Sequence, residues 1–245
     1  MTSFMNPDNI LQFAFVNFDT LKDRRIRGVV VDCHGYSDIA VWKQSDDTAA
    51  FLGENGVLFV HPYYPYDCWG NDGCIAFIDD ILRALYTGLN LDADRVPLVM
   101  TGGSMGGMTA LIYTLDGHYK PCAAAMNCPV TDMNRYFHTE HEYNTIYTAY
   151  CQRGFDLQKE IDRHSPILRT ADLPDIPYYI VGGERDKCVT VNEYIRPFAE
   201  KLRAEKSEVM CDVVADMGHC QINDFPEAAK KWRETLLGWV DRFQN

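Results

Sequence analysis

The sequence predicts an α/β fold in which a mostly parallel sheet is flanked by helices. Apolar runs of strand length alternate with amphipathic segments of helix length, and this alternation is typical of such a sheet. The chain has 245 residues, 47% of them hydrophobic and 12% aromatic, which is enough for one large domain with a sizeable core. We therefore expect residues 1–245 to form a single domain.

Six apolar runs are expected to be the strands, because they are rich in β-branched and aromatic residues and end in turn signals. They cover residues 26–35, 56–65, 95–103, 120–128, 176–183 and 207–216.

Three intervening segments carry apolar residues at helical spacing and are expected to pack against the sheet. In residues 191–203, Pro197 should bend or shorten the helix. The three stripes are Ile78, Ile81, Leu82 and Leu85; then Tyr194, Phe198 and Leu202; and finally Trp232, Leu236, Trp239 and Phe243.

The segment from 131 to 165 breaks this pattern, because it is polar and aromatic and contains no clear strand. Insertions between a strand and the next helix lie over the ends of a sheet, where loops carry function. We expect residues 131–165 to form a small cap.

Charge and composition exclude several classes of protein. The net charge of -12 argues against a general nucleic-acid binder, which needs a basic surface for phosphates. The N-terminus has no signal-peptide pattern, and no apolar run is long enough to predict a membrane span. We expect a cytoplasmic protein that binds neither nucleic acid nor membrane, with its nine cysteines mostly reduced.

No metal site is predicted from the spacing of metal-binding residues. Cys68 and Cys74 are too far apart in sequence for a zinc knuckle, and His138 and His141 fit no helical zinc motif.

The stretch "VMTGGSMGGMTA" (99–110) has the pattern of a nucleophile elbow, a strand that turns through Gly-x-Ser-x-Gly into a helix. Small neighbours would let the backbone turn sharply and expose Ser104 at the apex. The alternative interpretation is a glycine-rich turn with an incidental serine. The two are distinguished by whether the sequence also supplies a base and an acid for Ser104.

A serine nucleophile needs a histidine base that is oriented by a carboxylate, and the elbow places both later in the chain. Asp186 follows the strand at 176–183, and His219 follows the strand at 207–216. Both would lie at the carboxyl ends of parallel strands, where Ser104 is expected too. Glu184 and Asp216 are rival acids on the same two loops.

An oxyanion hole is expected beside Ser104. One donor should be the N–H of Met105, directly after the nucleophile. The other should come from "DCHGYSD" (32–38), where the glycine lets the backbone approach closely and Tyr36 offers its N–H.

In their order and spacing, "HGYSD", "TGGSMGG", "HSPI", "VGGERDKCV" and "MGH" resemble the α/β-hydrolase fold over residues 26–245. More narrowly they resemble the prolyl-oligopeptidase-like serine hydrolases (peptidase S9 type), a group that also holds stand-alone esterases. The resemblance implies that Ser104 is the nucleophile, Asp186 the orienting acid and His219 the base. It also implies that Tyr36 can donate through its hydroxyl, as an alternative to its N–H. Peptidases of this group carry a large N-terminal propeller, for which 245 residues leave no room, and this argues against oligopeptide cleavage.

The predicted function is hydrolysis of a small carboxylic ester through an acyl-enzyme, with no cofactor and no metal. A small peptidase or amidase is one alternative, for which Arg135 or Arg153 of the cap could bind a charged terminus. A non-catalytic binding protein is another, and the aromatic cap could also mediate a homodimer. Candidate substrate-binding residues, which could equally pack the cap on the core, are Tyr63, Tyr64, Trp69, Tyr136, Phe137 and Tyr143.

Overall fold

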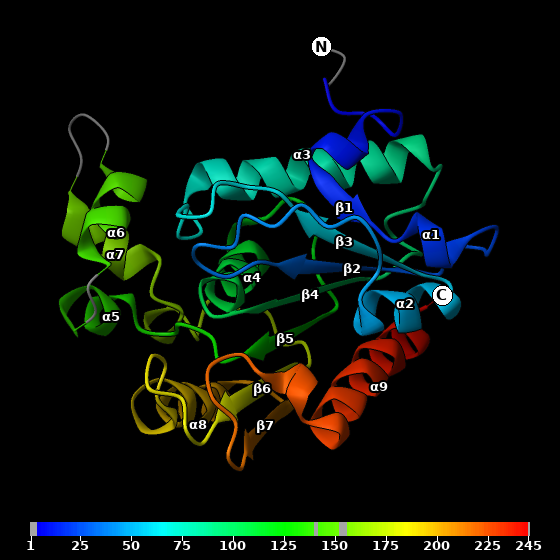
Figure 1. The fold of residues 1–245 in the computed structure, drawn as a ribbon. Coiled ribbons are helices and arrows are strands. Elements are labelled where there is room, and N and C mark those ends of the chain that lie inside the picture. The colour runs from blue at the N-terminus through cyan, green and yellow to red at the C-terminus, as the bar shows by residue number, and fades with distance from the viewer. Residues whose placement is uncertain (1–3, 140–141, 152–155, 245) are drawn as a thin grey trace.

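The computed structural model describes residues 4–139, 142–151 and 156–244. Within this part of the chain, seven strands form one sheet in the order β1-β3-β2-β4-β5-β6-β7 (Figure 1). All neighbours run parallel except β1, which pairs antiparallel with β3. The strands are β1 (Ala14–Val16), β2 (Gly28–Cys33), β3 (Val57–Pro62), β4 (Leu98–Gly103), β5 (Ala123–Asn127), β6 (Tyr178–Gly183) and β7 (Val209–Val214).

The six predicted strands are confirmed, each within the range that the sequence indicates. The strand β1 was not predicted, because a strand of three residues is too short to show an alternating pattern.

Helices cover both faces of the sheet, as predicted. The helices α3 (Asp72–Gly88), α4 (Met105–Asp116) and α8 (Arg196–Glu205) contribute to one core. The helices α2 (Asp47–Glu54) and α9 (Pro226–Phe243) contribute to the other. Because side chains alternate along a strand, Val29 and Val31 of β2 lie in the first core and Val30 lies in the second.

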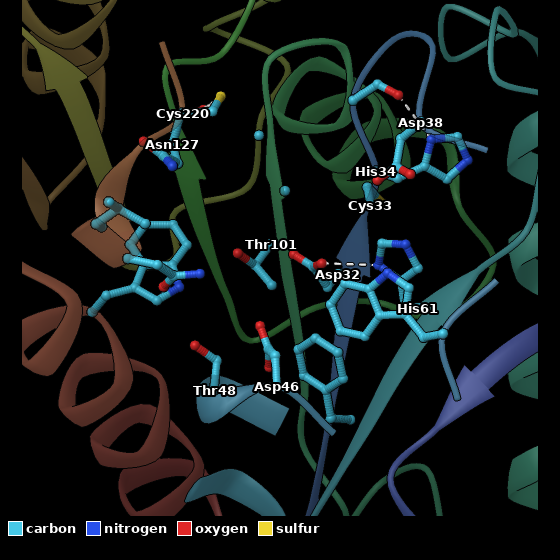
Figure 2. Close-up of a pocket in the computed structure, with 18 residues that line it drawn as sticks. Asp32, Cys33, His34, Asp38, Asp46, Thr48, His61, Thr101, Asn127 and Cys220 are labelled. Carbon is cyan, nitrogen blue, oxygen red and sulfur yellow. Dashed lines mark hydrogen bonds and ion pairs between the residues drawn. The ribbon is translucent and has the colours of Figure 1, made fainter. Parts of the chain in front are cut away.

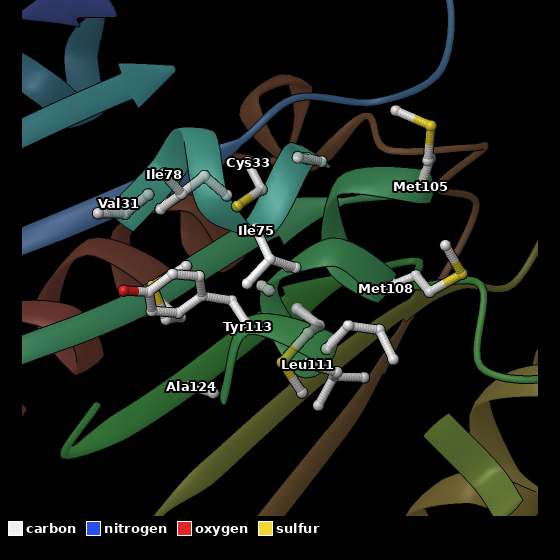
Figure 3. Packing of buried hydrophobic residues seen from close by; sticks show 14 of the residues in the cluster. Val31, Cys33, Ile75, Ile78, Met105, Met108, Leu111, Tyr113 and Ala124 are labelled. Atoms are coloured by element: carbon white, nitrogen blue, oxygen red, sulfur yellow. The ribbon is translucent and has the colours of Figure 1, made fainter. Parts of the chain in front are cut away.

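Helix α4 runs through the first core and is buried on every side from Met105 to Thr114. Figure 3 shows Met108, Leu111 and Tyr113 of this helix among Ile75 and Ile78 of α3. An α-helix that is apolar all round is expected only where protein surrounds it. The helix that follows Ser104 is therefore a rigid support.

The predicted helix at 191–203 is divided in two, as the position of Pro197 suggests. Val191–Ile195 forms a π-helical turn, and α8 begins at Arg196, so that Pro197 falls in its first turn, where a proline is tolerated. The remaining short elements are α1 (Phe18–Leu21) and three 3₁₀ turns at Ile10–Gln12, Pro166–Leu168 and Ile222–Asp224.

Three helices lie between β5 and β6, in the segment expected to form a cap: α5 (Met133–Thr139), α6 (Tyr143–Tyr150) and α7 (Leu157–Arg163). They gather beside the sheet, at the left of Figure 1. Asn71 donates a 3.0 Å hydrogen bond from its side chain to the carbonyl of Ala149, and Arg163 pairs with Asp72 at 2.6 Å. These contacts attach α6 and α7 to the start of α3.

None of the described helices is both long enough and apolar enough to cross a lipid bilayer.

Candidate active site

Ser104 occupies a strained turn between β4 and α4. Its backbone has φ 55° and ψ -123°, a region that non-glycine residues rarely adopt. Its N–H donates to the carbonyl of Asn127 at 3.0 Å, and this bond fixes the turn against the end of β5. Ser104 is therefore held at the apex between strand and helix.

The glycines of the elbow allow two backbones to approach closely. A Cβ on Gly106 would lie 1.9 Å from the carbonyl oxygen of Cys33, and one on Gly102 would lie 2.6 Å from the same oxygen. The end of β2 thus lies directly against the first turn of α4, and any side chain there would force them apart.

A line of hydrogen bonds joins Ser104 to His219 and Asp186. The Oγ of Ser104 lies 2.9 Å from Nε2 of His219, and Nδ1 of the same ring lies 2.7 Å from Oδ2 of Asp186. The other oxygen of Asp186 accepts the backbone N–H groups of Cys188 at 2.8 Å and Val189 at 2.9 Å. The structure therefore brings together the three residues that the sequence selected from three separate strand ends.

The charge states of Asp186 and His219 depend on burial and on their hydrogen-bond partners. Burial acts to raise the pKa of Asp186, but the hydrogen bonds from His219 and from the N–H of Val189 hold it below its ordinary value. Burial acts to lower the pKa of His219, but the hydrogen bond to Asp186 and the contact with Cys128 outweigh it and raise the pKa to about 9. Asp186 is thus an ionised carboxylate that favours the protonated ring.

The two rival acids have other partners. The carboxylate of Glu184 accepts the N–H of Asp216 at 3.3 Å, and Asp216 forms an ion pair with Arg185. These contacts join the two loops, whereas Asp186 is the carboxyl group hydrogen-bonded to His219.

The turn after β2 lies beside Ser104, where the second oxyanion donor is expected. A Cβ on Gly35 would lie 3.7 Å from the Cβ of Ser104. His34 fixes this turn, since its ring stacks on Tyr64 at 3.9 Å and its two nitrogens lie within hydrogen-bonding distance of the carbonyls of Gly35 and Tyr64. The hydroxyl of Tyr64 in turn donates to the carbonyl of His34 at 2.9 Å.

The side chain of Tyr36 contacts Trp69 and the start of α6. Its ring stacks on Trp69 at 5.4 Å, and burial together with a hydrogen bond to Glu142 raises the pKa of its hydroxyl. Among the hydrogen bonds of the described residues, none uses the backbone N–H of Tyr36 or of Met105. Both N–H groups are thus available as donors.

The aromatic residues considered for substrate binding occupy different environments. Tyr64 and Trp69 are buried, and the indole N–H of Trp69 donates to Thr145 of α6 at 3.1 Å. Tyr136 is also buried and contacts Trp69, so these two residues pack helices α5 and α6 on the core, whereas Tyr64 packs on His34 in the turn after β2. The hydroxyl of Tyr63 accepts from the N–H of Trp42, Phe137 is half-buried, and Tyr143 is exposed.

The cap residues weighed for a charged clamp or a metal are only partly described. Arg135 forms an ion pair with Glu193 at 2.9 Å, which compensates its charge. His138 lies on α5, while His141 and Arg153 lie outside the described residues.

A polar cavity of about 320 Å³ adjoins the elbow. Gly102, Gly103 and Cys220 line its side nearest to Ser104. Figure 2 shows Asp32 and His61 hydrogen-bonded at 3.0 Å across the cavity from the side chains of Asn127 and Cys220. The further polar lining residues include Asp38, Asp46, Thr48 and Thr101.

Two buried polar atoms of this cavity, Oγ1 of Thr101 and Oδ1 of Asn127, have no hydrogen-bond partner among the described residues. Neither residue was predicted from the sequence, since polar residues at or just before a strand end carry no motif.

Two thiols beside His219 were also missed. The side chain of Cys220 lies 3.8 Å from Nε2 of His219, and Cys128 contacts the same two residues. The hydrogen bond from Cys220 lowers the pKa of Cys128 to about 6. The nine cysteines, all of them within the described residues, form no disulfide.

Taken with the sheet order, the strained serine between a central parallel strand and a buried helix defines an α/β-hydrolase. A sequence profile of the prolyl oligopeptidase family matches residues 69–245, and the chain belongs to this family of serine hydrolases. A search of curated proteins by sequence finds no match.

Solved structures with the same fold include peptidases and esterases. A puromycin-hydrolyzing peptidase from Mycobacterium tuberculosis superposes with a TM-score of 0.74 at 17% identity, over 95% of this chain and 37% of that protein. An esterase from Pyrococcus furiosus gives 0.61 at 20% identity, over 90% and 85% of the two chains. Esterase B from Lactobacillus rhamnosis gives 0.66 at 17% identity, over 91% and 78%. The chain thus spans little more than a third of the peptidase but most of each esterase.

Proposed function

We infer that the chain is a carboxylesterase with Ser104 as nucleophile, His219 as general base and Asp186 as the acid that orients His219. The observation that carries this inference is the unbroken line of two hydrogen bonds, 2.9 Å and 2.7 Å, through the two ring nitrogens of His219. Asp186 accepts the hydrogen bond from the Nδ1–H group, so that in the neutral ring the lone pair of Nε2 faces the serine hydroxyl.

The reaction follows from this arrangement. The Oγ of Ser104 attacks the ester carbonyl while its proton passes to Nε2 of His219, and the imidazolium then protonates the departing alcohol. Water repeats the sequence on the acyl-enzyme and releases the acid. Neither half of the reaction requires a cofactor.

The charge on the former carbonyl oxygen would be stabilised by the N–H groups of Met105 and Tyr36. Met105 is the first residue of α4, so its N–H has no acceptor within the helix and carries the positive end of the helix dipole. Donors of this kind are typically worth about 10²–10³ in rate. The hydroxyl of Tyr36 is engaged with Glu142, which favours its backbone over its side chain.

An ester is favoured over a peptide because no free positive charge is described where a charged terminus would be held. Arg135, the described arginine weighed as a clamp for such a terminus, is paired with Glu193. Amide hydrolysis on a short substrate is retained as the second candidate, because peptidases share the fold and the family.

The cavity beside the elbow supports a substrate with a polar group that donates hydrogen bonds. Oδ1 of Asn127 can only accept, and Asp32 and Asp46 add carboxylates to the same lining. A buried polar atom without a partner costs about 1–3 kcal/mol, so a hydroxyl or amine that reaches it would be preferred to an alkyl group.

A fluorophosphonate probe tests the nucleophile first. One covalent adduct in the intact mass of the wild-type chain, and none in Ser104→Ala, is the expected result. Failure of the folded wild-type chain to react would contradict an activated serine and favour the non-catalytic binding protein.

A paired substrate panel then tests the class. p-Nitrophenyl esters and the p-nitroanilides of the same acyl groups differ only in the bond that is cleaved. We expect kcat/KM to be higher for the esters; faster cleavage of the anilides would favour the amidase. Esters with hydroxylated acyl groups should be preferred to matched alkyl esters, and Thr101→Val should reduce that preference.

A further inference from the structure

Three potential metal ligands meet at the proposed general base. The Sγ atoms of Cys128 and Cys220 and a ring nitrogen of His219 all lie within 4.8 Å of one another, and Cys220 Sγ is 3.8 Å from Nε2. The described residues contain no other such group of three. We propose that Cys128, Cys220 and His219 form a binding site for a zinc ion that inhibits hydrolysis.

The donor set suits zinc. Two thiolates and an imidazole are the ligands that Zn²⁺ prefers, and the fourth tetrahedral position is open to water or to the hydroxyl of Ser104. With Zn–S bonds of about 2.3 Å, two sulfurs of a tetrahedral site lie about 3.8 Å apart, so side-chain shifts of about 1 Å close the cluster. Zinc binding requires both sulfurs as thiolates and a neutral Nε2 on His219, so it releases the protons that these three groups still carry.

The backbone is arranged so that the two thiols converge. Cys128 has φ 48° and Cys220 has φ 56°, both in the left-handed region that side chains other than glycine rarely adopt. Because of this turn, consecutive residues His219 and Cys220 direct their side chains to one point. Gly103 leaves the space for it, since a Cβ there would lie 3.1 Å from the sulfur of Cys220.

The second layer of the site is present too. Metal-binding histidines usually donate their other N–H to a carboxylate, which fixes the ring and makes it a stronger ligand. Asp186 holds Nδ1 of His219 in this way at 2.7 Å and is itself fixed by two backbone N–H groups. The group that would orient the general base would therefore also orient the metal ligand.

Inhibition follows because the two functions use the same lone pair. Nε2 of His219 faces Ser104 Oγ at 2.9 Å, and it cannot accept the serine proton while it is bonded to zinc. Zinc release would restore hydrolysis without any covalent change in the chain.

Cobalt(II) tests the site by a signal that does not depend on activity. The metal-free wild-type chain is titrated with Co²⁺ in the presence of a phosphine reductant, which keeps the thiols reduced and excludes a disulfide. We expect one Co²⁺ per chain with thiolate-to-cobalt absorption in the near ultraviolet, and displacement of that Co²⁺ by one Zn²⁺. The same zinc titration should abolish hydrolysis of a p-nitrophenyl ester, and a chelator should restore it.

Variants then identify the ligands. For each variant we measure the zinc concentration that halves its own rate of hydrolysis. In Cys128→Ser and in Cys220→Ser this concentration should rise by more than ~100-fold, which is the upper end of the loss seen when a residue that only hydrogen-bonds to a metal ligand is removed. Cys151→Ser, which changes an exposed thiol outside the cluster, should leave zinc sensitivity unchanged.

Cobalt binding without thiolate absorption would overturn the proposal. So would equal zinc sensitivity in wild type and both cluster variants, or no metal bound at a large excess. The cobalt signal is read without any substrate, so failure of the esterase assignment and failure of the metal site are distinguishable.

Discussion

Gly106→Ala tests whether the contact between the elbow and the end of β2 determines both stability and rate. A Cβ at this position would lie 1.9 Å from the carbonyl oxygen of Cys33 and 2.5 Å from that of His34. Real Cβ atoms essentially never come closer than 3.0 Å to such atoms. The first turn of α4 and the proposed oxyanion turn must therefore separate by about 1 Å.

The expected losses of stability and of rate depend on how rigid the first turn of α4 and the end of β2 are. The clash is with backbone and not with a flexible side chain, and α4 is buried on all sides, so neither element can yield freely. Overpacking of a dense core typically costs about 1–3 kcal/mol, and for a chain of this size each kcal/mol lowers Tm by roughly 2–4 °C. A displacement of about 1 Å between nucleophile and oxyanion donor can also cost about 100-fold in rate.

The assay compares Gly106→Ala with Gly238→Ala, the same change on α9, where a Cβ would meet nothing within 4 Å. Thermal unfolding followed by circular dichroism should show a lower Tm for Gly106→Ala. For Gly238→Ala it should show an unchanged or higher Tm, since alanine favours a helix over glycine by about 0.5–1 kcal/mol. kcat/KM should fall in the first variant alone. If Gly106→Ala matches wild type in both Tm and kcat/KM, the close approach does not constrain the site.

Three further predictions concern the proposed triad and oxyanion hole. Asp186→Asn should lower kcat by about 10⁴, because Asn favours the wrong tautomer of the base. A rate near that of wild type would mean that another acid orients His219. The base must be neutral to accept a proton, so its pKa of about 9 predicts that kcat/KM of the metal-free chain rises from pH 7 to pH 9. A profile that is already flat at pH 7 would mean that the contacts of His219 with Asp186 and Cys128 do not raise its pKa. Tyr36→Phe should keep kcat within a few-fold of wild type if the backbone N–H is the donor, whereas a loss of about 10²–10³ in stopped-flow measurements would assign the hydroxyl.

The meeting of the three proposed triad residues could be predicted because it depends on topology. In a parallel sheet every strand ends at the same edge, so residues just after separate strands meet whatever their distance in sequence. Ser104, Asp186 and His219 each follow such a strand, and the structure brings them to hydrogen-bonding distance. The elbow glycines added a local signal, because close backbone approach leaves few other residues possible.

The features that could not be predicted from the sequence depend on where side chains point and on contacts between distant segments. Cys128 also follows a strand end, and Cys220 follows the proposed base, but their convergence requires a left-handed backbone at both, which no pattern of thiols indicates. Tyr64 and Trp69 were selected as loop aromatics, and their burial against His34 and α6 depends on tertiary packing. The strand β1 is defined by its pairing with β3 and not by its own three residues.

The strained residues around His219 connect the two proposals. Three non-glycine residues with positive φ surround its ring: Ser104 at 55°, Cys128 at 48° and Cys220 at 56°. Strain of this kind costs of order 1–3 kcal/mol per residue and persists only where the surrounding structure enforces it, as the 2.7 Å bond from the N–H of Cys128 to the carbonyl of Val181 does. Hydrolysis gives a reason for the strain at Ser104 but uses neither thiol. A metal bound through both thiols gives a reason for the strain at Cys128 and Cys220. The metal would also occupy the lone pair of Nε2 that activates Ser104. Zinc should therefore slow the labelling of Ser104 by a fluorophosphonate, in proportion to the fraction of chains that hold the ion.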